Sequence, residues 1–308
     1  SIDFELFWGE RDTNFAESYK KNILGGRKAI PIILNLFKKK EIHSTWAIVA
    51  MASFSNKKDL IKYLPSNSPG YLNKILDPYP GIEFIGKNEK EDPLHFGSSL
   101  VKNMIDTPHT EIASHSFSHF YCMEKRTNEN AFKEDLISAA NSFNRMDLSP
   151  KSYIFCRNQY EEKDLKELHK AGFETFRSNE SSNIFSPMPG YFKRGFKLLD
   201  SYINLSGPNF SVPSFKNKLV SIPSSRFLRP YSNNKLERLR LKRILDNMTL
   251  AAKNKKGFHL WWHPHNFGEN LQININFLEV IIDHFQFLKN KYSMESLTMS
   301  EVAKTIKN

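Results

Sequence analysis

Short apolar segments alternate with longer amphipathic segments along almost the whole chain of 308 residues. Short β-branched and aromatic runs predict strands, and longer runs with a 3.6-residue period predict helices. Such alternation is typical of parallel βαβ units. The expected strands are residues 1–7, 44–50, the run ending at His115, 152–156, 174–177 and 258–262. The expected helices are residues 14–40, with breaks near Gly25-Gly26 and Pro31, then 94–105, 129–146, 161–171, 235–253, 271–289 and a short one near Ser300.

This length suits one large α/β domain. We therefore expect residues 1–308 to form a single domain built as a (β/α) barrel or an open sheet. Residues 183–225 are rich in Ser, Pro and Asn and are expected to form a long irregular excursion. Loops of that length in a compact domain often bind substrate.

The formal net charge is +11, from 44 Lys and Arg against 33 Asp and Glu. This surplus suits an anionic partner, and it equally suits a lysine-rich surface without one. No basic run alternates with aromatic residues, so nucleic-acid binding is not expected. The two cysteines, Cys122 and Cys156, have neither metal-type nor disulfide-type spacing, which favours the reducing cytoplasm.

No apolar run approaches the roughly 20 residues of a membrane span, so we expect no transmembrane segment. Ser1 lies inside what looks like the end of a strand. We therefore expect a few residues to precede it in the natural chain, and a targeting segment there is left open.

Polar residues of a particular kind follow the expected strands. In both barrels and open parallel sheets, chemistry collects at the carboxyl ends of the strands. Four strand ends carry residues suited to metal binding or to acid–base work, where chance would place small or apolar ones. These residues are Asp3 and Glu5, His115 and His119, Arg157 and Tyr160, and His263 and His265.

His115 and His119 are four residues apart. If the chain turns helically after Ser114, this spacing places both imidazoles on one face. Neutral imidazole is a common ligand of zinc. An isolated pair of this kind is weak support for a metal site, and agreement with the other strand ends strengthens it.

The order of these groups resembles the polysaccharide deacetylase family, carbohydrate esterase family 4. The matching segments are Asp3-Phe4-Glu5, His115-Ser116-Phe117-Ser118-His119, Arg157-Asn158-Gln159-Tyr160 and Trp261-Trp262-His263. The resemblance spans nearly the whole chain. It implies a distorted (β/α) barrel, often with seven parallel strands, and metal-dependent hydrolysis of an N-acetyl group.

The resemblance also implies roles for these residues. His115 and His119 would hold a divalent metal together with one acid, and zinc is the metal that we expect. Glu5 reaches farther than Asp3, so we expect Glu5 to be the third ligand and Asp3 the base, with the reverse assignment left open. Arg157 would keep Asp3 ionised, and His263 would protonate the leaving amine.

Three further residues are expected to bind substrate. They are Trp8, as a sugar-stacking wall, Tyr160 and His265. The third motif departs from the family, because Gln159 stands where the family has proline. Arg229-Pro230-Tyr231 spells that motif more literally. It comes too late in the order, so we interpret it as a chance match or an element of a substrate loop.

The sequence therefore predicts a metal-dependent carbohydrate N-deacetylase, as in bacterial surface-glycan biosynthesis. Its substrate would be a sugar, with a nucleotide- or lipid-linked sugar suiting the positive charge. Two alternatives stay open: a hydrolase of another amide or of an O-acetyl ester, and a catalytically degenerate glycan-binding protein. The oligomeric state is not predicted.

Overall fold

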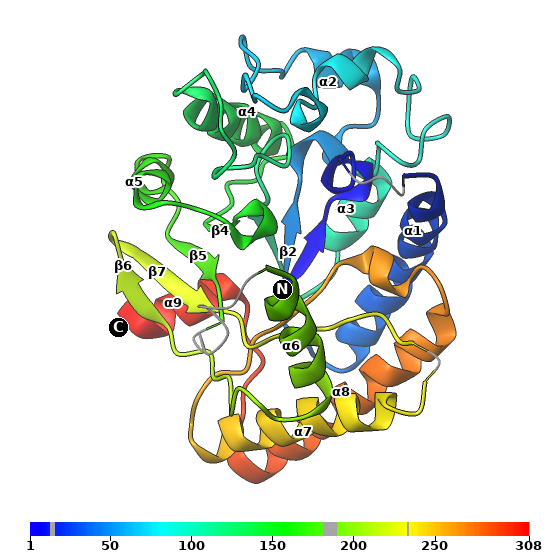
Figure 1. The fold of residues 1–308 in the computed structure, drawn as a ribbon, viewed down its shortest axis with the longest axis vertical. Helices are drawn as coiled ribbons and strands as arrows, with labels where there is room; N and C mark the ends of the chain where they lie inside the picture. The colour runs from blue at the N-terminus through cyan, green and yellow to red at the C-terminus, as the bar shows by residue number, and fades with distance from the viewer. Residues whose placement is uncertain (13–15, 181–189, 233, 308) are drawn as a thin grey trace.

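The computed structural model describes residues 1–12, 16–180, 190–232 and 234–307, and its centre is a curved seven-stranded sheet (Figure 1). The strand order is β1-β2-β3-β4-β5-β7-β6, in which β6 alone pairs antiparallel. The strands are β1 (Ile2–Phe4), β2 (Ser44–Ile48), β3 (Thr110–Ser114), β4 (Ser152–Ile154), β5 (Thr175–Ser178), β6 (Ser214–Lys216) and β7 (Leu219–Pro223).

A parallel pair of short strands, β8 (Arg226–Phe227) and β9 (Leu260–Trp261), continues the sheet beyond β1. The backbone N–H of Asp3 donates to the carbonyl of Trp262 at 2.9 Å, and Ile2 and Trp262 form a parallel bridge. The wall of parallel strands therefore curves around toward closure. This arrangement confirms the predicted α/β fold of the distorted (β/α) barrel type, with an antiparallel edge strand added.

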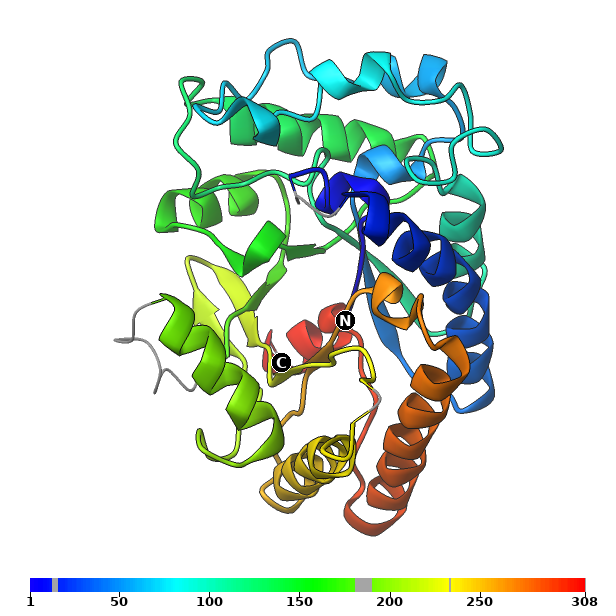
Figure 2. The same ribbon diagram turned by 45° about the vertical axis from the view of Figure 1, so that its right-hand side comes forward.

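Helices surround the sheet (Figure 2). The α-helices are α1 (Ala16–Lys39), α2 (Lys57–Ile61), α3 (Ser98–Ile105), α4 (Ala131–Asn144), α5 (Glu162–Lys170), α6 (Gly190–Tyr202), α7 (Glu237–Lys253), α8 (Leu271–Tyr292) and α9 (Met299–Lys307). Short 3-10 helices are η1 (Leu6–Gly9), η2 (Ala50–Ser53), η3 (Lys74–Leu76), η4 (Pro80–Glu83), η5 (Cys156–Asn158) and η6 (Pro264–Phe267). Among the described helices, none is long and apolar enough to cross a membrane.

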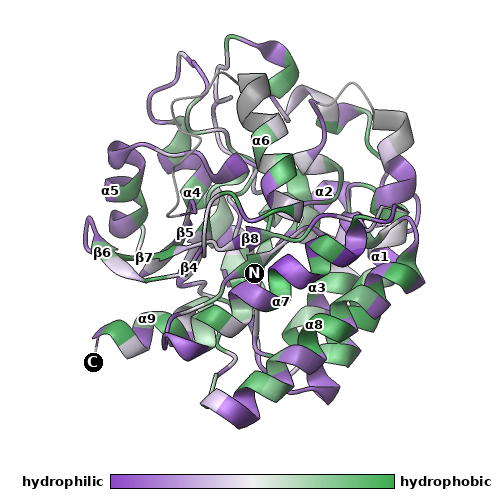
Figure 3. Ribbon diagram, turned by 60° about the horizontal axis from the view of Figure 1, so that its bottom comes forward, coloured by the Kyte–Doolittle hydropathy of each residue, from purple (hydrophilic) through white to green (hydrophobic). Residues whose placement is uncertain are grey.

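The largest core cluster lies between the sheet and the long helices. Trp46 and Ile48 of β2 are fully buried there, together with Ile33 of α1 and Leu288 of α8. Hydrophobic and hydrophilic residues alternate along α8 (Figure 3), as expected for a helix that buries one face. Burial of this apolar surface is the main stabilising contribution in a chain of this size.

Helix α9 lies under the amino ends of the strands. Its residues Met299 and Ala303 are buried against inward-facing side chains of β2, β3, β4 and β7. The Glu111 carboxylate accepts hydrogen bonds from the Thr45 hydroxyl at 2.8 Å, the Ser300 N–H at 3.1 Å and the Ser152 hydroxyl. These contacts fix the end of the barrel opposite to the carboxyl ends of the strands.

Helix α1 is continuous, so the expected breaks near Gly25-Gly26 and Pro31 were wrong. Pro31 is exposed, and solvent can satisfy the carbonyl that it leaves without an N–H donor. The two glycines let α1 pack directly on the backbone of η6. A Cβ on Gly25 would lie 2.1 Å from the Gly268 carbonyl oxygen, and one on Gly26 would lie 2.9 Å from the His265 Cα.

The segment expected to be an irregular excursion is more ordered than predicted. Within residues 183–225, the described part contains α6, β6 and β7, whereas residues 183–189 lie outside the described residues. The apolar run Leu219-Val220-Ser221-Ile222 forms the buried β7, and the Ser, Pro and Asn around it concealed this signal.

The contact of α1 with η6 can be tested by replacing Gly25 with alanine. The new Cβ meets backbone that has no side chain to move aside, so we expect a loss of about 1–3 kcal/mol in the free energy of unfolding. Gly195, in α6, is the matched control, because a Cβ there meets no atom within 4 Å. Gly195→Ala should stabilise by about 0.5–1 kcal/mol in the same urea denaturation. Similar losses for both variants would contradict this account of α1.

Candidate functional site

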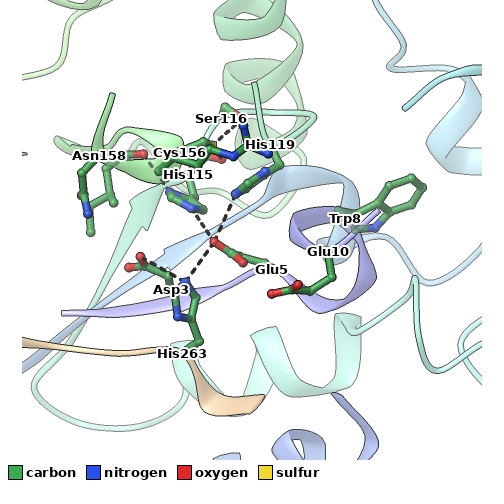
Figure 4. Close-up of polar contacts among 12 residues, drawn as sticks. Asp3, Glu5, Trp8, Glu10, His115, Ser116, His119, Cys156, Asn158 and His263 are labelled. Atoms are coloured by element: carbon green, nitrogen blue, oxygen red, sulfur yellow. Dashed lines mark hydrogen bonds and ion pairs between the residues drawn. The ribbon is translucent and has the colours of Figure 1, made fainter. Parts of the chain in front are cut away.

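Strand β1 and the residue that follows it carry two buried carboxylates. Asp3 and Glu5 are 1% and 4% exposed. Figure 4 shows both side chains pointing toward the same group of histidines. Because burying two carboxylates costs free energy unless they are paired, the surrounding residues must supply hydrogen bonds and positive charge.

His115 and His119 lie in an irregular turn after β3, so the conditional expectation of a helical turn was wrong. Ser116 and His119 adopt backbone φ values of 67° and 58°, in the left-handed region that residues other than glycine rarely adopt. The Asp135 carboxylate of α4 stabilises this turn, accepting from the Phe117 N–H at 2.8 Å and the Ser118 N–H at 3.0 Å. The two imidazoles still meet, with ring centroids 5.2 Å apart.

Three imidazoles converge on one oxygen of Glu5 (Figure 4). Its Oε1 lies 2.9 Å from the His115 Nε2, 3.2 Å from the His119 Nε2 and 3.4 Å from the His263 Nε2. His263 follows β9, so the three histidines come from two different parts of the barrel. The structure thus brings together the histidines and acids that the sequence placed at separate strand ends.

Arg177, the third residue of β5, forms a two-pronged ion pair with Asp3. Its Nη1 and Nη2 donate to Asp3 Oδ1 and Oδ2 at 2.8 and 2.6 Å, and its side chain is fully buried. The predicted pairing of Arg157 with Asp3 was wrong. Arg157 has a φ of 55°, is 37% exposed and pairs with Asp12 and Glu124. The turn after β4 directs it away from β1.

Mutual electrostatics set the charges of the site. Burial raises the pKa of Asp3, but Arg177, His115 and His263 together outweigh burial and hold that pKa below its usual value. Burial likewise opposes ionisation of Glu5, whose pKa is held well below its usual value by His263 and His119. Both acids are therefore carboxylates near neutral pH.

The two histidines after β9 have opposite pKa shifts although their rings stack, with centroids 4.8 Å apart. Burial lowers the pKa of His263, but the Glu5 and Asp3 carboxylates together more than compensate, so the net shift is upward. Burial and the neighbouring His263 lower the pKa of His265 to about 3. His263 can therefore carry a proton that His265 does not. Opposite shifts in adjacent groups are typical of acid–base sites.

Glu10 is a further acid of the site that the sequence analysis missed. Its Oε1 lies 3.6 Å from the His265 Nε2, and burial together with the Glu5 carboxylate raises its pKa to about 7. It follows η1 and belongs to no motif. The sequence gives no sign that a glutamate seven residues beyond Asp3 belongs to the site. Only the turn of η1 in the structure brings it back to β1.

The donor atoms fit a divalent cation. The His115 Nδ1 lies 2.8 Å from the Ile154 carbonyl oxygen and donates to it, which leaves Nε2 as the ligand atom facing Glu5. Among the described residues, three groups have ligand atoms within 4.8 Å of one another: Asp3 with Glu5 and His115, His115 with His119 and Cys156, and Glu5 with Glu10 and His265. The His119 Nδ1 is buried without a hydrogen-bond partner among the described residues.

Two predicted substrate-binding residues lie elsewhere. Trp8 is 3% exposed and its indole N–H donates to the His95 carbonyl at 2.8 Å, so the expectation of an open sugar-stacking wall was wrong. Its ring points away from the histidines in Figure 4. Tyr160 is half-buried and packs against Phe155 and Phe176. Its predicted role in substrate binding stays a prediction, as does that of His265.

Comparisons with known proteins show the fold. No family model matches the sequence, and no curated protein matches it. A structure from Mycobacterium smegmatis, provisionally assigned as a polysaccharide deacetylase, matches with a TM-score of 0.60 and 11% identity over 99% of this chain and 88% of that one. An allantoinase matches with a TM-score of 0.51 and 13% identity over 93% and 75% of the two chains.

A third structure, a GH57-type branching enzyme from Pyrococcus horikoshii, matches with a TM-score of 0.51 and 10% identity over 97% of this chain and 68% of that one. Identities this low establish a shared fold alone. The chain therefore has the fold of polysaccharide deacetylases, as its motifs predicted.

The pairing of Asp3 with Arg177, and not with Arg157, gives a stability prediction. Arg177→Met leaves Asp3 buried without its cation and should cost about 3–5 kcal/mol in the free energy of unfolding at pH 7. Arg157→Met removes a half-exposed pair and should cost less than about 1 kcal/mol. Urea denaturation of both variants measures the difference, and equal losses would contradict the assignment.

The same pair predicts a pH dependence. The pKa of Asp3 is lower in the folded chain than in the unfolded one. The stability that this supplies is therefore fully present above the unfolded pKa, about 4, and is lost as the pH falls through the folded pKa. The difference in the free energy of unfolding between wild type and Arg177→Met, measured by urea denaturation, should therefore decrease as the pH drops below about 4.

Proposed function

We propose that this protein is a metal-dependent hydrolase that removes an N-acetyl group from a carbohydrate. The observation that supports the proposal most is the convergence of three imidazoles on Glu5 beside an ionised Asp3. A deacetylase-like fold around this arrangement agrees with it. We further propose a role in bacterial surface-glycan biosynthesis, with a substrate carried on a nucleotide or a lipid.

Glu5, His115 and His119 would hold the metal. Two imidazoles and a carboxylate are the donor set of many catalytic zinc sites, so zinc is the ion that we propose. When bound, such an ion lowers the pKa of water and polarises the acyl carbonyl. The assignment of Glu5, rather than Asp3, as the acidic ligand rests on its oxygen, which lies between the two imidazoles.

Asp3 is the proposed base. The ion pair with Arg177 keeps its carboxylate charged and fixes its orientation, so one oxygen can accept the proton of the attacking water. His263 is the proposed acid. Its Nε2 lies 3.8 Å from Asp3 Oδ2, and its raised pKa favours the protonated form. The leaving amine needs this proton, because an amide anion is a very poor leaving group.

A second candidate keeps the site and changes the bond. The likeness to an allantoinase favours hydrolysis of an amide other than an N-acetyl group. Release of acetate from N-acetyl sugars and from O-acetyl sugars, measured beside the opening of cyclic amides, separates these candidates. The degenerate glycan-binding protein predicts none of these activities and no metal requirement.

Metal content tests the proposed ligands. Zinc loading of the wild type should give about one ion per chain, and His119→Ala and Glu5→Gln should each lose most of it together with acetate release. His169→Ala is the control, because His169 lies exposed on α5 and away from the site. Elemental analysis and a chelation–restoration assay measure both quantities. A wild type that stays metal-free after zinc soaking would sink the proposal.

Activity tests the proposed acid and base. Asp3→Asn and His263→Ala should each lower kcat by at least about a hundredfold, because proton transfer by a positioned group contributes that much. Both variants should keep bound zinc, since neither residue is a proposed ligand. Near wild-type rates in either variant, measured as acetate release, would remove that residue from the mechanism.

A further inference from the structure

Four arginines gather beside the barrel on β8, the segment after it and α7: Arg226, Arg229, Arg240 and Arg243. Three of them are buried and paired. Arg226 and Arg243 share the Asp200 carboxylate at 3.3 and 3.0 Å, and the Arg240 Nε donates to Glu237 Oε2 at 2.8 Å. One carboxylate thus serves two guanidinium groups, so this cluster is short of negative charge.

Arg229 differs from the other three arginines in its hydrogen bonding. Its guanidinium has no hydrogen bond or ion pair to any residue in the described part of the chain, although its backbone carbonyl accepts from the Arg240 Nη1. The side chain is half-buried. Burial lowers the pKa of Arg229, and Arg240 and Arg226 add to this effect, whereas Tyr202 and the Glu180 carboxylate oppose it. A partly desolvated guanidinium that makes no hydrogen bond can be stabilised further by an anion that binds it directly.

The position of Arg229 links it to the candidate active site. The ring of Phe227 lies 5.8 Å from the ring of His263, and the Leu228 N–H donates to the Trp261 carbonyl at 2.8 Å. Arg229 follows Leu228 directly, two residues after Phe227, which places its backbone near the histidines that follow β9. The Asn266 amide also donates to the Leu228 carbonyl at 3.2 Å, which fixes this segment against η6.

Amide hydrolysis at Glu5 and the histidines needs no guanidinium at this place. A planar fork of N–H donors matches a phosphate, and a guanidinium is preferred where phosphate binding is two-pronged. Arg229 begins the Arg229-Pro230-Tyr231 segment that the sequence left as a chance match or a substrate-loop element. The surrounding structure favours the second interpretation.

We propose that Arg229 binds a phosphate group of the substrate, so that the hydrolysed sugar is a phosphate-bearing one. This inference rests on the proposed function, because it places the phosphate on the same molecule as the acyl group. The Arg226–Asp200–Arg243 cluster and Arg240 hold the Arg229 segment and supply the surplus positive charge. Nucleotide-linked and lipid-linked sugars share this chemistry.

Calorimetric titration of the zinc-loaded protein with inorganic phosphate tests the binding directly. Arg229→Gln should weaken phosphate binding at least about tenfold, the usual effect of losing hydrogen bonds to a charged group. Arg238→Gln is the matched control, since Arg238 is exposed on the same helix as Arg240, and it should bind as the wild type does. Any phosphate bound by zinc contributes equally in all three proteins. Equal binding by wild type and Arg229→Gln would overturn the inference.

Kinetics separate this inference from the proposed function. Arg229→Gln should raise KM for an N-acetyl sugar phosphate at least about tenfold and leave an uncharged N-acetyl glycoside unchanged. If wild type and Arg229→Gln hydrolyse both sugars with the same kcat and KM, the inference about Arg229 is wrong and the proposed function still holds. Binding of phosphate that depends on Arg229, without hydrolysis of any acylated sugar, sinks the proposed function alone. Nucleoside diphosphate and polyprenyl diphosphate sugars then identify the source of the phosphate.

Discussion

Two buried carboxylates at the end of β1 govern how this barrel is assembled. Neither Asp3 nor Glu5 can stay charged in the interior without cationic or hydrogen-bonding partners. Those partners come from widely separated places: Arg177 from β5, two histidines from the turn after β3, and His263 from beyond β9. The charge balance of two residues therefore fixes the relative positions of three further parts of the sheet.

The two ends of the barrel divide the work. At the amino ends of the strands, Glu111 and α9 form a fully bonded network that serves packing. At the carboxyl ends lie the left-handed Ser116 and His119, the stacked pair of His263 and His265, and the half-buried Arg229. Such features cost stability and persist where function requires them. Hydrogen bonds from N–H groups of the turn to the Asp135 carboxylate offset the cost of the left-handed conformations of Ser116 and His119.

Much of this arrangement was predictable, for a physical reason. Parallel strands bring their carboxyl ends to one edge, so Asp3, Glu5, His115, His119 and His263 could be placed together from strand periodicity and motifs alone. Arg177 was not predicted because an arginine at the end of a short strand belongs to no recognisable motif. Arg157 was chosen instead because it lies in a segment that matches a motif. Trp8 was misjudged because sequence does not tell a buried indole from an exposed one. The breaks expected in α1 were wrong because the glycines there serve a close backbone contact with η6, which no local pattern records.

The bridge between Ile2 and Trp262 joins residues that are nearly the whole chain apart. Strand β1 is therefore synthesised well before the neighbour with which Ile2 pairs. Until β9 arrives, β1 has an open edge, and until Arg177 and His263 arrive its carboxylates lack their partners. Pairings of such long sequence separation slow folding, and open strand edges invite association with other chains. The assembly of this site is therefore also the step at which a nascent chain is most vulnerable to aggregation.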